Sequence, residues 1–333
     1  MATIRDIAAK AGVSPAAVSR ILSNDPGLSV APATRKRVLD CAAELGYSRK
    51  RTRDKSGFKM GILQWFTAEE ELSDDYYLSI RKGIEDYCDA NAISLARAYR
   101  VDGATGSLPE DTDGVICVGK FSAEEASALI KHYKNILFLD MEVEHPEVTT
   151  ITMDFKTAVN EAMRYLIKLG HKKIAYIGGQ EYASGSEPLE DPRKKAYESY
   201  VRKHKLEKDD LLSEGSFSAE SGYEQMKTML AKVKPDAVLA ASDAIAVGVI
   251  KAINDSGLKC PGDISVIGIN DDRMSAYMTP ALSTMRAPAY DMGQHGANLV
   301  YAAGNLSIST PLKVMIPCVL IERESCSPRK ETK

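Results

Sequence analysis

Hydrophobic residues in the first 46 positions recur at the spacing of short helices separated by turns. Over residues 3–11 they share one helical face, at Ile4, Ile7, Ala8 and Ala11. Gly12 can adopt the left-handed conformation that ends this helix, and Ser14 with Pro15 suits the first turn of the next. Two short helices joined in this way form a helix-turn-helix, whose second helix enters the major groove of DNA. The pattern therefore predicts a DNA-binding unit.

A third helix is predicted over residues 35–46, with a buried face at Val38, Leu39, Ala42 and Leu45. The three basic residues of its first turn, 35–37, are poor partners for the helix dipole unless an anion lies nearby. Residues 48–57 contain no apolar side chain, so they predict a linker. We expect a helix-turn-helix domain at 1–48, a basic linker at 49–57 and a larger core at 58–333.

From Phe58 onward, continuous apolar stretches alternate with amphipathic stretches. Strands are predicted at 59–65, 93–96, 114–119, 136–140, 173–179, 237–241 and 264–269. Helices are predicted at 76–90, 123–133, 155–169, 193–204, 221–230 and 244–256. This alternation is typical of parallel sheets covered by helices on both faces. It occurs in two runs, about 58–154 and 155–285, which predicts a two-lobed α/β core with a ligand cleft at the strand ends.

The charge of the chain is unevenly distributed, although the net charge is only −3. Residues 1–60 hold 12 Lys and Arg against 5 Asp and Glu, whereas the remainder holds 31 against 41. A basic head on an acidic body is expected of a protein that docks one end on phosphate. A chance cluster of surface lysines is the alternative.

Other classes of protein are disfavoured by composition. We expect no signal peptide and no membrane-spanning helix, because no apolar run is long enough. The six cysteines are scattered without a CxxC pair, which is typical of a reduced cytoplasmic protein with inert thiols. We expect no metal site and no cofactor.

The motifs resemble those of the LacI/GalR family of bacterial transcription regulators, and the resemblance covers nearly the whole chain. It is carried by residues 2–8, 12–14, 18–20, 45–47, 241–248, 261–268 and 280–284. Residues 75–78, 217–223 and 269–271 are most similar to galactoside-responsive repressors. The resemblance implies a homodimer bound to operator DNA, with a core like that of periplasmic sugar-binding proteins. A sugar in the cleft would change the angle between the lobes and thereby the affinity for the operator.

The same resemblance places base-reading residues at Pro15, Ala16, Ala17 and Arg20. Arginine can form paired hydrogen bonds with guanine, and alanine can pack on a thymine methyl group. Proline and alanine leave little hydrogen-bonding capacity facing the bases, and simple packing is the alternative for Ala16 and Ala17. Further DNA contacts are expected at Thr3, Ser14, Ser19 and Asn24. For Ser14, capping the second helix is the alternative.

The linker departs from the family. Relatives carry a hinge helix with an Ala-Arg-x-Leu pattern, whose leucine wedges into the minor groove. This chain has Arg49, Arg51 and Arg53 and no leucine there. We therefore expect no sharp kinking of the DNA. Instead, operator binding would depend on phosphate neutralisation and weaken steeply with salt.

Sugar recognition needs planar groups that pair with vicinal hydroxyls and an aromatic face for the apolar side of the ring. The resemblance places effector contacts at Asp75, Lys120, Asp154, Arg193, Phe217, Ser242, Asp243 and Asn270. Arg193 opens an Arg-x-x-Ala-Tyr stretch where the family has an effector-contacting arginine. Asn270 replaces an aspartate of many relatives, so it can donate as well as accept hydrogen bonds. A core position for Phe217 and a helix cap for Asp243 are the alternatives.

Three other functions compete with this one. An enzyme is disfavoured, because neither GxGxxG nor GxxxxGK[ST] occurs and the five histidines show no ligand or triad spacing. A periplasmic sugar carrier conflicts with the basic head. The third keeps the family but changes the ligand to another sugar or a phosphoprotein corepressor. Residues 322–333 carry no heptad repeat, so we expect a dimer rather than a tetramer.

Overall fold

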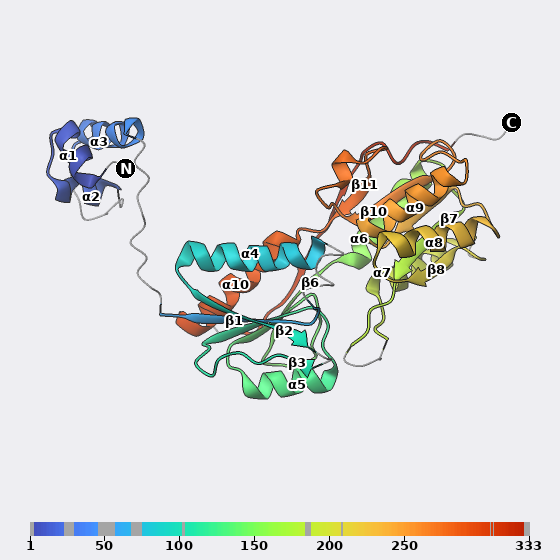
Figure 1. Ribbon diagram of the computed structural model, residues 1–333, viewed down its shortest axis with the longest axis horizontal. Helices are drawn as coiled ribbons and strands as arrows, with labels where there is room; N and C mark the ends of the chain where they lie inside the picture. The colour runs from blue at the N-terminus through green and yellow to red at the C-terminus, as the bar shows by residue number, and fades with distance from the viewer. Residues whose placement is uncertain are drawn as a thin grey trace. The chain divides into compact units, whose positions relative to one another are not determined.

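The computed structural model describes residues 3–22, 30–45, 57–67, 75–101, 104–183, 188–207, 209–306, 308 and 310–329 (Figure 1). The predictions for Asn24, Arg49, Arg51 and Arg53 lie outside these residues. The chain divides into two units, Met1–Asp54 and Lys55–Lys333. Each unit has a hydrophobic core of its own.

The first unit is a bundle of three helices, α1 Ile4–Ala11, α2 Pro15–Leu22 and α3 Pro32–Glu44. The predicted helix-turn-helix is confirmed, with Gly12 left-handed at φ 66° after α1. The third helix begins three residues earlier than predicted. Its predicted buried face was wrong at Leu39, which is 47% exposed. Val38 and Ala42 are buried as predicted, together with Cys41, because residues spaced by three and four positions share a face.

The second unit begins with a lobe built on a seven-stranded sheet, in the order β12-β6-β5-β4-β1-β2-β3. Its strands are β1 Lys59–Gln64, β2 Ser94–Val101, β3 Ala104–Thr105, β4 Gly114–Val118, β5 Ile136–Leu139, β6 Thr149–Met153 and β12 Lys313–Ile316. The pairs are parallel except β2 with β3. α4 Asp75–Asn91 and α10 Ala289–Asn305 pack together on one face, and α5 Ala123–His132 covers the other (Figure 1).

The second lobe is built on a six-stranded sheet, in the order β13-β11-β10-β9-β7-β8. Its strands are β7 Ile174–Gly179, β8 Leu212–Gly215, β9 Ala237–Ala240, β10 Ser265–Asn270, β11 Ser283–Arg286 and β13 Val319–Ile321. Only β13 runs antiparallel to its neighbour among the described strands of this sheet. The flanking helices are α6 Phe155–Lys168, α7 Pro192–His204, α8 Ala219–Leu230 and α9 Asp243–Asp255, with a short 3-10 turn η2 Ser275–Tyr277. α6 pairs with α7, and α8 with α9.

The carboxyl-terminal segment returns to the first lobe, which the predicted division at residue 155 did not anticipate. After β11 the chain forms α10, then β12 beside β6, and finally β13 beside β11. α10 packs so closely on α4 that a Cβ on Gly83 would lie 2.0 Å from the carbonyl oxygen of Tyr290. The two lobes are therefore joined by three crossing segments, after Met153, Arg286 and Ile316.

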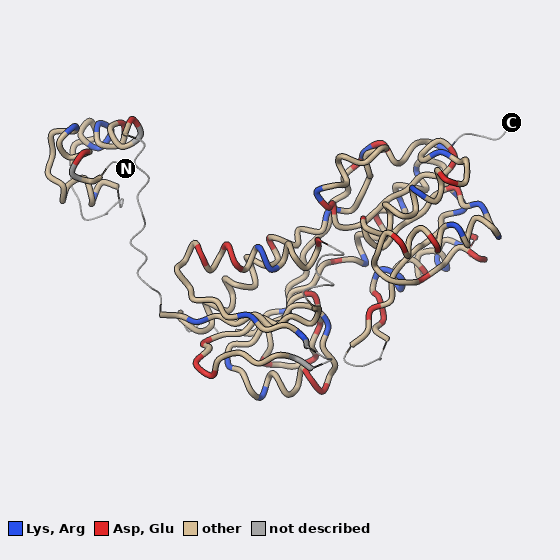
Figure 2. Tube along the Cα trace, in the orientation of Figure 1, with Lys and Arg blue, Asp and Glu red and all other residues tan. Residues whose placement is uncertain are grey.

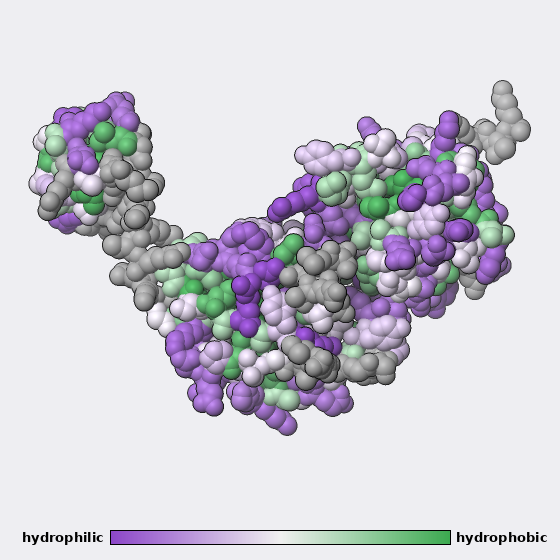
Figure 3. Space-filling view, in the orientation of Figure 1, coloured by the Kyte–Doolittle hydropathy of each residue, from purple (hydrophilic) through white to green (hydrophobic). Residues whose placement is uncertain are grey.

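The buried strands bear out the predicted α/β architecture. β4 and β9 are buried along their whole length, as parallel strands covered on both faces are. Figure 2 shows basic and acidic positions interspersed over both lobes, and on the face in Figure 3 hydrophilic side chains cover much of their outer surface. No helix in the described part of the chain is both long and apolar enough to span a bilayer.

Candidate functional site

Most of the described residues predicted to contact DNA lie in α2 or directly before it. Ser14, Pro15, Ala16 and Arg20 are exposed and Ala17 and Ser19 are half-buried. Val18 and Ile21 face the core instead. The helix therefore presents a surface of small side chains with one arginine, which fits close approach to base edges.

Two of these predicted contacts also cap helices. The backbone N–H of Ala17 donates to Ser14 Oγ at 3.1 Å, so the capping alternative for Ser14 is present in the structure. Thr3 caps α1 and forms a capping box with Asp6. The Thr3 side chain lowers the pKa of the Asp6 carboxyl. Contact of Ser14 and Thr3 with phosphate stays a prediction.

A cavity of about 550 Å³ lies between the two lobes of the second unit. The residues that line it follow the carboxyl ends of strands in both sheets, as expected for folds of this kind. The first lobe contributes Trp65, Phe66, Tyr76, Tyr77, Arg100, Lys120 and Asp140. The second lobe contributes Phe155, Gln180, Glu181, Arg193, Phe217 and Asn270, among others. The predictions for Lys120, Arg193, Phe217 and Asn270 thus meet in one place.

Arg193 is held between two aromatic rings at this cavity. Its guanidinium carbon lies 4.9 Å from the Phe155 centroid and 4.5 Å from the Phe217 centroid. Its Nε donates to both carboxylate oxygens of Asp191, at 2.9 and 3.0 Å, and its Nη1 donates to the carbonyl of Ala241 at 3.1 Å. Burial would lower the pKa of Arg193, but the carboxylates of Asp191 and Glu181 outweigh it and raise the pKa above its usual value.

Asp140 is the centre of a polar cluster in the first lobe. It follows β5 with a left-handed backbone at φ 63°, and its side chain is buried. Tyr76 and Tyr77 donate to its two oxygens at 3.0 and 2.9 Å, and Lys120 Nζ lies 2.6 Å from Oδ2. Burial, followed by the charge of Asp140, raises the pKa of both tyrosines well above the usual value. The tyrosines therefore remain hydrogen-bond donors.

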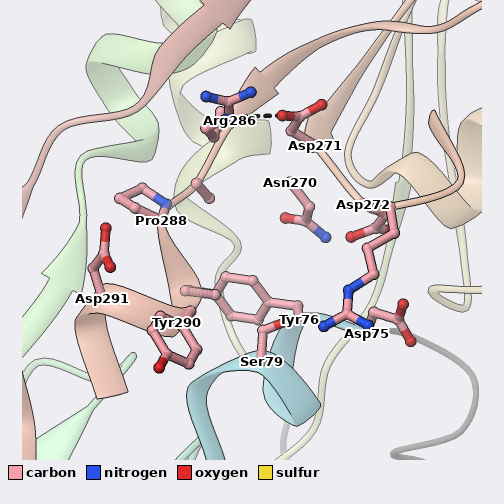
Figure 4. Close-up of a pocket in the computed structure, with 13 residues that line it drawn as sticks. Asp75, Tyr76, Ser79, Asn270, Asp271, Asp272, Arg286, Pro288, Tyr290 and Asp291 are labelled. Atoms are coloured by element: carbon pink, nitrogen blue, oxygen red, sulfur yellow. Dashed lines mark hydrogen bonds and ion pairs between the residues drawn. The ribbon is translucent and has the colours of Figure 1, made fainter. Parts of the chain in front are cut away.

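Asp75 lines a second, smaller cavity rather than the larger one. This cavity of about 230 Å³ shares Tyr76 and Asn270 with the larger cavity (Figure 4). Asn270 has a φ of 124°, and among the described residues its Oδ1 has no hydrogen-bond partner. Figure 4 shows its amide between Tyr76 and the ion pair of Arg286 with Asp271.

The structure places Asp154, Ser242 and Asp243 outside the lining of the larger cavity. Asp154 caps α6 by accepting from the N–H of Thr157 at 2.9 Å. Ser242, rather than Asp243, caps α9 by accepting from the N–H of Ile245 at 3.2 Å. These side chains therefore have local partners that account for their position.

Asp243 anchors the loop that follows β10. It accepts hydrogen bonds from Ser275 Oγ at 2.5 Å, Thr284 Oγ1 at 2.6 Å and the N–H of Asp272 at 2.9 Å. Burial raises the pKa of Asp243 to about 6, although these hydrogen bonds lower it. The carboxyl is thus held by the fold and not offered to the cavity.

Several lining residues were missed from the sequence. Asp140 ends one predicted strand and Glu181 lies two residues after another, so the rule that ligands bind at strand ends could have found them. Tyr76 and Tyr77 open the helix predicted at 76–90 and were not considered as site residues, although tyrosine carries a polar end besides its apolar ring. The position of Arg100 depends on how far β2 extends, and the predicted strand ended four residues earlier.

Comparison with known proteins agrees with this architecture. Residues 3–50 match the model of bacterial regulatory proteins of the lacI family, and residues 144–326 match the periplasmic binding protein-like domain. The HTH-type transcriptional regulator GalR of Streptococcus thermophilus is 34% identical over 94% of this chain and 95% of its own length. The HTH-type transcriptional repressor MelR of Bacillus subtilis is 33% identical over 98% of both chains.

Solved structures share the fold over nearly the whole chain. The transcriptional regulator CelR in complex with cellobiose has a TM-score of 0.70 at 22% identity, covering 98% of this chain and 100% of that one. The lac repressor dimer bound to operator and the anti-inducer ONPF has a TM-score of 0.68 at 23% identity, covering 98% and 99%. The full-length relatives and the two matched domains establish that the chain belongs to the lacI family of bacterial regulatory proteins and is a DNA-binding transcriptional regulator.

Proposed function

We propose that this chain is a cytoplasmic repressor of sugar-utilisation genes, and that a galactoside bound between the lobes releases it from its operator. The observation that carries the proposal is the position of Arg193 beside Phe217 at the cavity. A guanidinium can bind vicinal hydroxyls, and an aromatic ring can cover the apolar face of a sugar. The names of the relatives GalR, MelR and GanR support the same class of regulated genes.

The proposed switch depends on the two lobes. A ligand that contacts both lobes favours one angle between them. Operator DNA favours one arrangement of the helix-turn-helix domains that bind it. Effector and operator would therefore bias the same two-state equilibrium. The three crossing segments are the places where backbone torsions can absorb a change of angle.

We also propose that the active form is a homodimer. Operators read by helix-turn-helix proteins consist of two half-sites, so two copies of α2 are needed. The second lobe exposes the apolar side chains of Val247, Met274 and Tyr277, the last at 81%. Asp243 ties the start of α9 to the loop that carries Met274 and Tyr277. Exposed apolar side chains of this kind support an interface with a second copy.

A thermal-shift screen tests the effector class. A ligand that binds only the folded cavity stabilises the protein by about 2.7 kcal/mol at a hundred times its Kd. We expect galactosides to raise the unfolding midpoint of the core more than other sugars. A screen in which no sugar raises the midpoint would contradict the proposal. Stabilisation by a phosphoprotein alone would favour the corepressor alternative.

A further inference from the structure

Five charged side chains line the larger cavity, and they differ in how their charge is balanced. The ion pairs are Arg100 with Glu125, Lys120 with Asp140, and Arg193 with Asp191. Within the described residues, Glu181 is the one lining carboxylate with no ion pair. The lining holds three cations and two carboxylates, and each of the three cations is already paired with a carboxylate other than Glu181. An anionic group placed beside Glu181 would therefore meet a negative charge that no ion pair balances.

Glu181 Oε1 has a tyrosine hydroxyl as its neighbour, but the hydrogen of that hydroxyl is used elsewhere. This oxygen lies 3.5 Å from the hydroxyl oxygen of Tyr77, which belongs to the opposite lobe. A tyrosine hydroxyl carries one hydrogen, and Tyr77 lies closer to Asp140 Oδ2, at 2.9 Å. The hydrogen therefore goes to Asp140. Glu181 Oε1 is left facing a lone pair, with capacity to accept a hydrogen bond from a ligand.

Hydrogen bonds hold the backbone at Glu181 in place. The Nε2 of Gln180 donates to the carbonyls of Glu181 and Leu189, both at 2.8 Å. The N–H of Leu189 also donates to the Glu181 carbonyl at 2.9 Å. Burial raises the pKa of the Glu181 carboxyl, and the more distant charges of Lys120 and Arg193 offset only part of this effect. A hydroxyl donor would replace the solvation that the carboxylate has lost.

We propose that Glu181 determines the specificity of the cavity, by accepting hydrogen bonds from hydroxyls of a neutral sugar and by rejecting sugars that carry a phosphate or carboxylate group. This inference rests on the proposed function, because it assumes that a sugar occupies the cavity. It specifies a neutral rather than an anionic sugar, and it assigns this selectivity to one side chain. The negative charge of Glu181 would repel a phosphate or carboxylate group strongly, because the dielectric constant inside the cavity is lower than in water. This repulsion would dominate the discrimination between neutral and anionic sugars.

Isothermal titration calorimetry on the full chain tests the assignment. The probes are galactose, galactose 6-phosphate and galacturonate, with the matching glucose series. We expect the neutral sugar to bind at least about thirtyfold more tightly than either anionic form. In Glu181→Gln, we expect the neutral sugar to bind about tenfold more weakly, because a charged acceptor is replaced by a neutral one. The ratio of the Kd of an anionic sugar to the Kd of the neutral sugar should also fall about tenfold in this variant.

Glu190→Gln is the matched control, because Glu190 is an exposed carboxylate of the same segment that pairs with Lys195 and does not line the larger cavity. It should bind like the wild type. Equal binding of neutral and anionic sugars, or an unchanged preference in Glu181→Gln, would overturn the role of Glu181 alone. If no sugar of either series binds the wild type, the proposed function fails as well.

Discussion

The guanidinium of Arg193 and the ring of Phe217 are stacked at the inner wall of the cavity, with the guanidinium carbon 4.5 Å from the ring centroid. The two side chains reach this position from different elements, α7 and the turn after β8. The same guanidinium is oriented by Asp191 and by the carbonyl of Ala241. It therefore presents a fixed planar edge toward a ligand.

Arg193→Lys should abolish induction while leaving operator binding intact. Lysine keeps the charge beside Asp191 but has no planar fork, so it cannot form the paired hydrogen bonds to two hydroxyls. We expect sugar affinity to fall by at least about thirtyfold, since hydrogen bonds to a charged group contribute about 1.5–3 kcal/mol. Calorimetry with the sugar and fluorescence anisotropy with operator DNA measure the two activities separately.

Two further variants make this result interpretable. Arg193→Ala should lose sugar binding too, but it leaves Asp191 buried without its cation and should lower stability by about 3–5 kcal/mol. Arg202→Ala, at an exposed position of the same helix, should change neither activity. Normal induction in Arg193→Lys would show that the effector is bound by other residues.

The ion pair of Lys120 with Asp140 should behave as a buried pair. Asp140 is 5% exposed, so Lys120→Met leaves a carboxylate with two tyrosine donors and no cation. We expect a loss of about 3 kcal/mol in the free energy of unfolding. The double variant Lys120→Met with Asp140→Asn should recover most of this loss, because no charge remains. Urea unfolding followed by circular dichroism gives both values, and equal losses in the single and double variants would refute the pairing.

Titration of Asp243 should lower the free energy of unfolding as the pH rises from about 4 to about 6. Its pKa is raised from 3.8 to about 6 in the folded chain by burial. In this window the unfolded chain releases the proton while the folded chain still holds it, so each rise in pH favours unfolding. The effect amounts to about 3 kcal/mol and is complete above pH 6.

Asp243→Asn isolates this effect because asparagine does not titrate. The stability of the variant relative to the wild type should rise by about 3 kcal/mol between about pH 4 and pH 6.5. The measurement is urea unfolding at a series of pH values for both proteins. A difference that stays constant with pH would contradict a raised pKa for Asp243.

The basic linker should make operator binding steeply dependent on salt. The slope of log affinity against log salt changes by about 0.9 for every phosphate that the protein neutralises. Replacing Arg49, Arg51 and Arg53 with alanine should therefore flatten the slope by about 2.7 per protomer if all three bind phosphate. Replacing the exposed Lys203 of α7 should leave it unchanged. A slope that survives the triple replacement would rule out phosphate neutralisation by the linker.

The sequence predicted most of the fold because its elements have strong periodicity. Buried strands such as β4 and β9 are continuous apolar runs, and α1 and α2 have capping residues at the expected places. The prediction was weakest after residue 285, where α10 is rich in glycine and alanine. Those small residues are there because α10 packs against α4 at close range, and that packing cannot be inferred from a local pattern.

Only part of the site could be predicted, because tertiary contacts decide which polar side chains face the cavity. Arg193 and Phe217 could be placed by family motifs, and both line the cavity. Ser242 and Asp243 match family motifs equally well, yet their side chains turn to Ile245, Ser275 and Thr284. Whether a polar side chain at a strand end faces a cavity or a neighbouring loop depends on tertiary contacts, which spacing alone does not contain.

The reciprocity of sugar and operator binding tests the central claim most directly. The protein can be used to select an operator from a random double-stranded DNA library, and the sugar comes from the thermal-shift screen. Calorimetry then gives the Kd of the sugar with and without saturating operator, and anisotropy gives the Kd of the operator with and without saturating sugar. We predict that each ligand weakens the other by the same factor, about tenfold or more. Independent binding, with both ratios equal to one, would contradict the account.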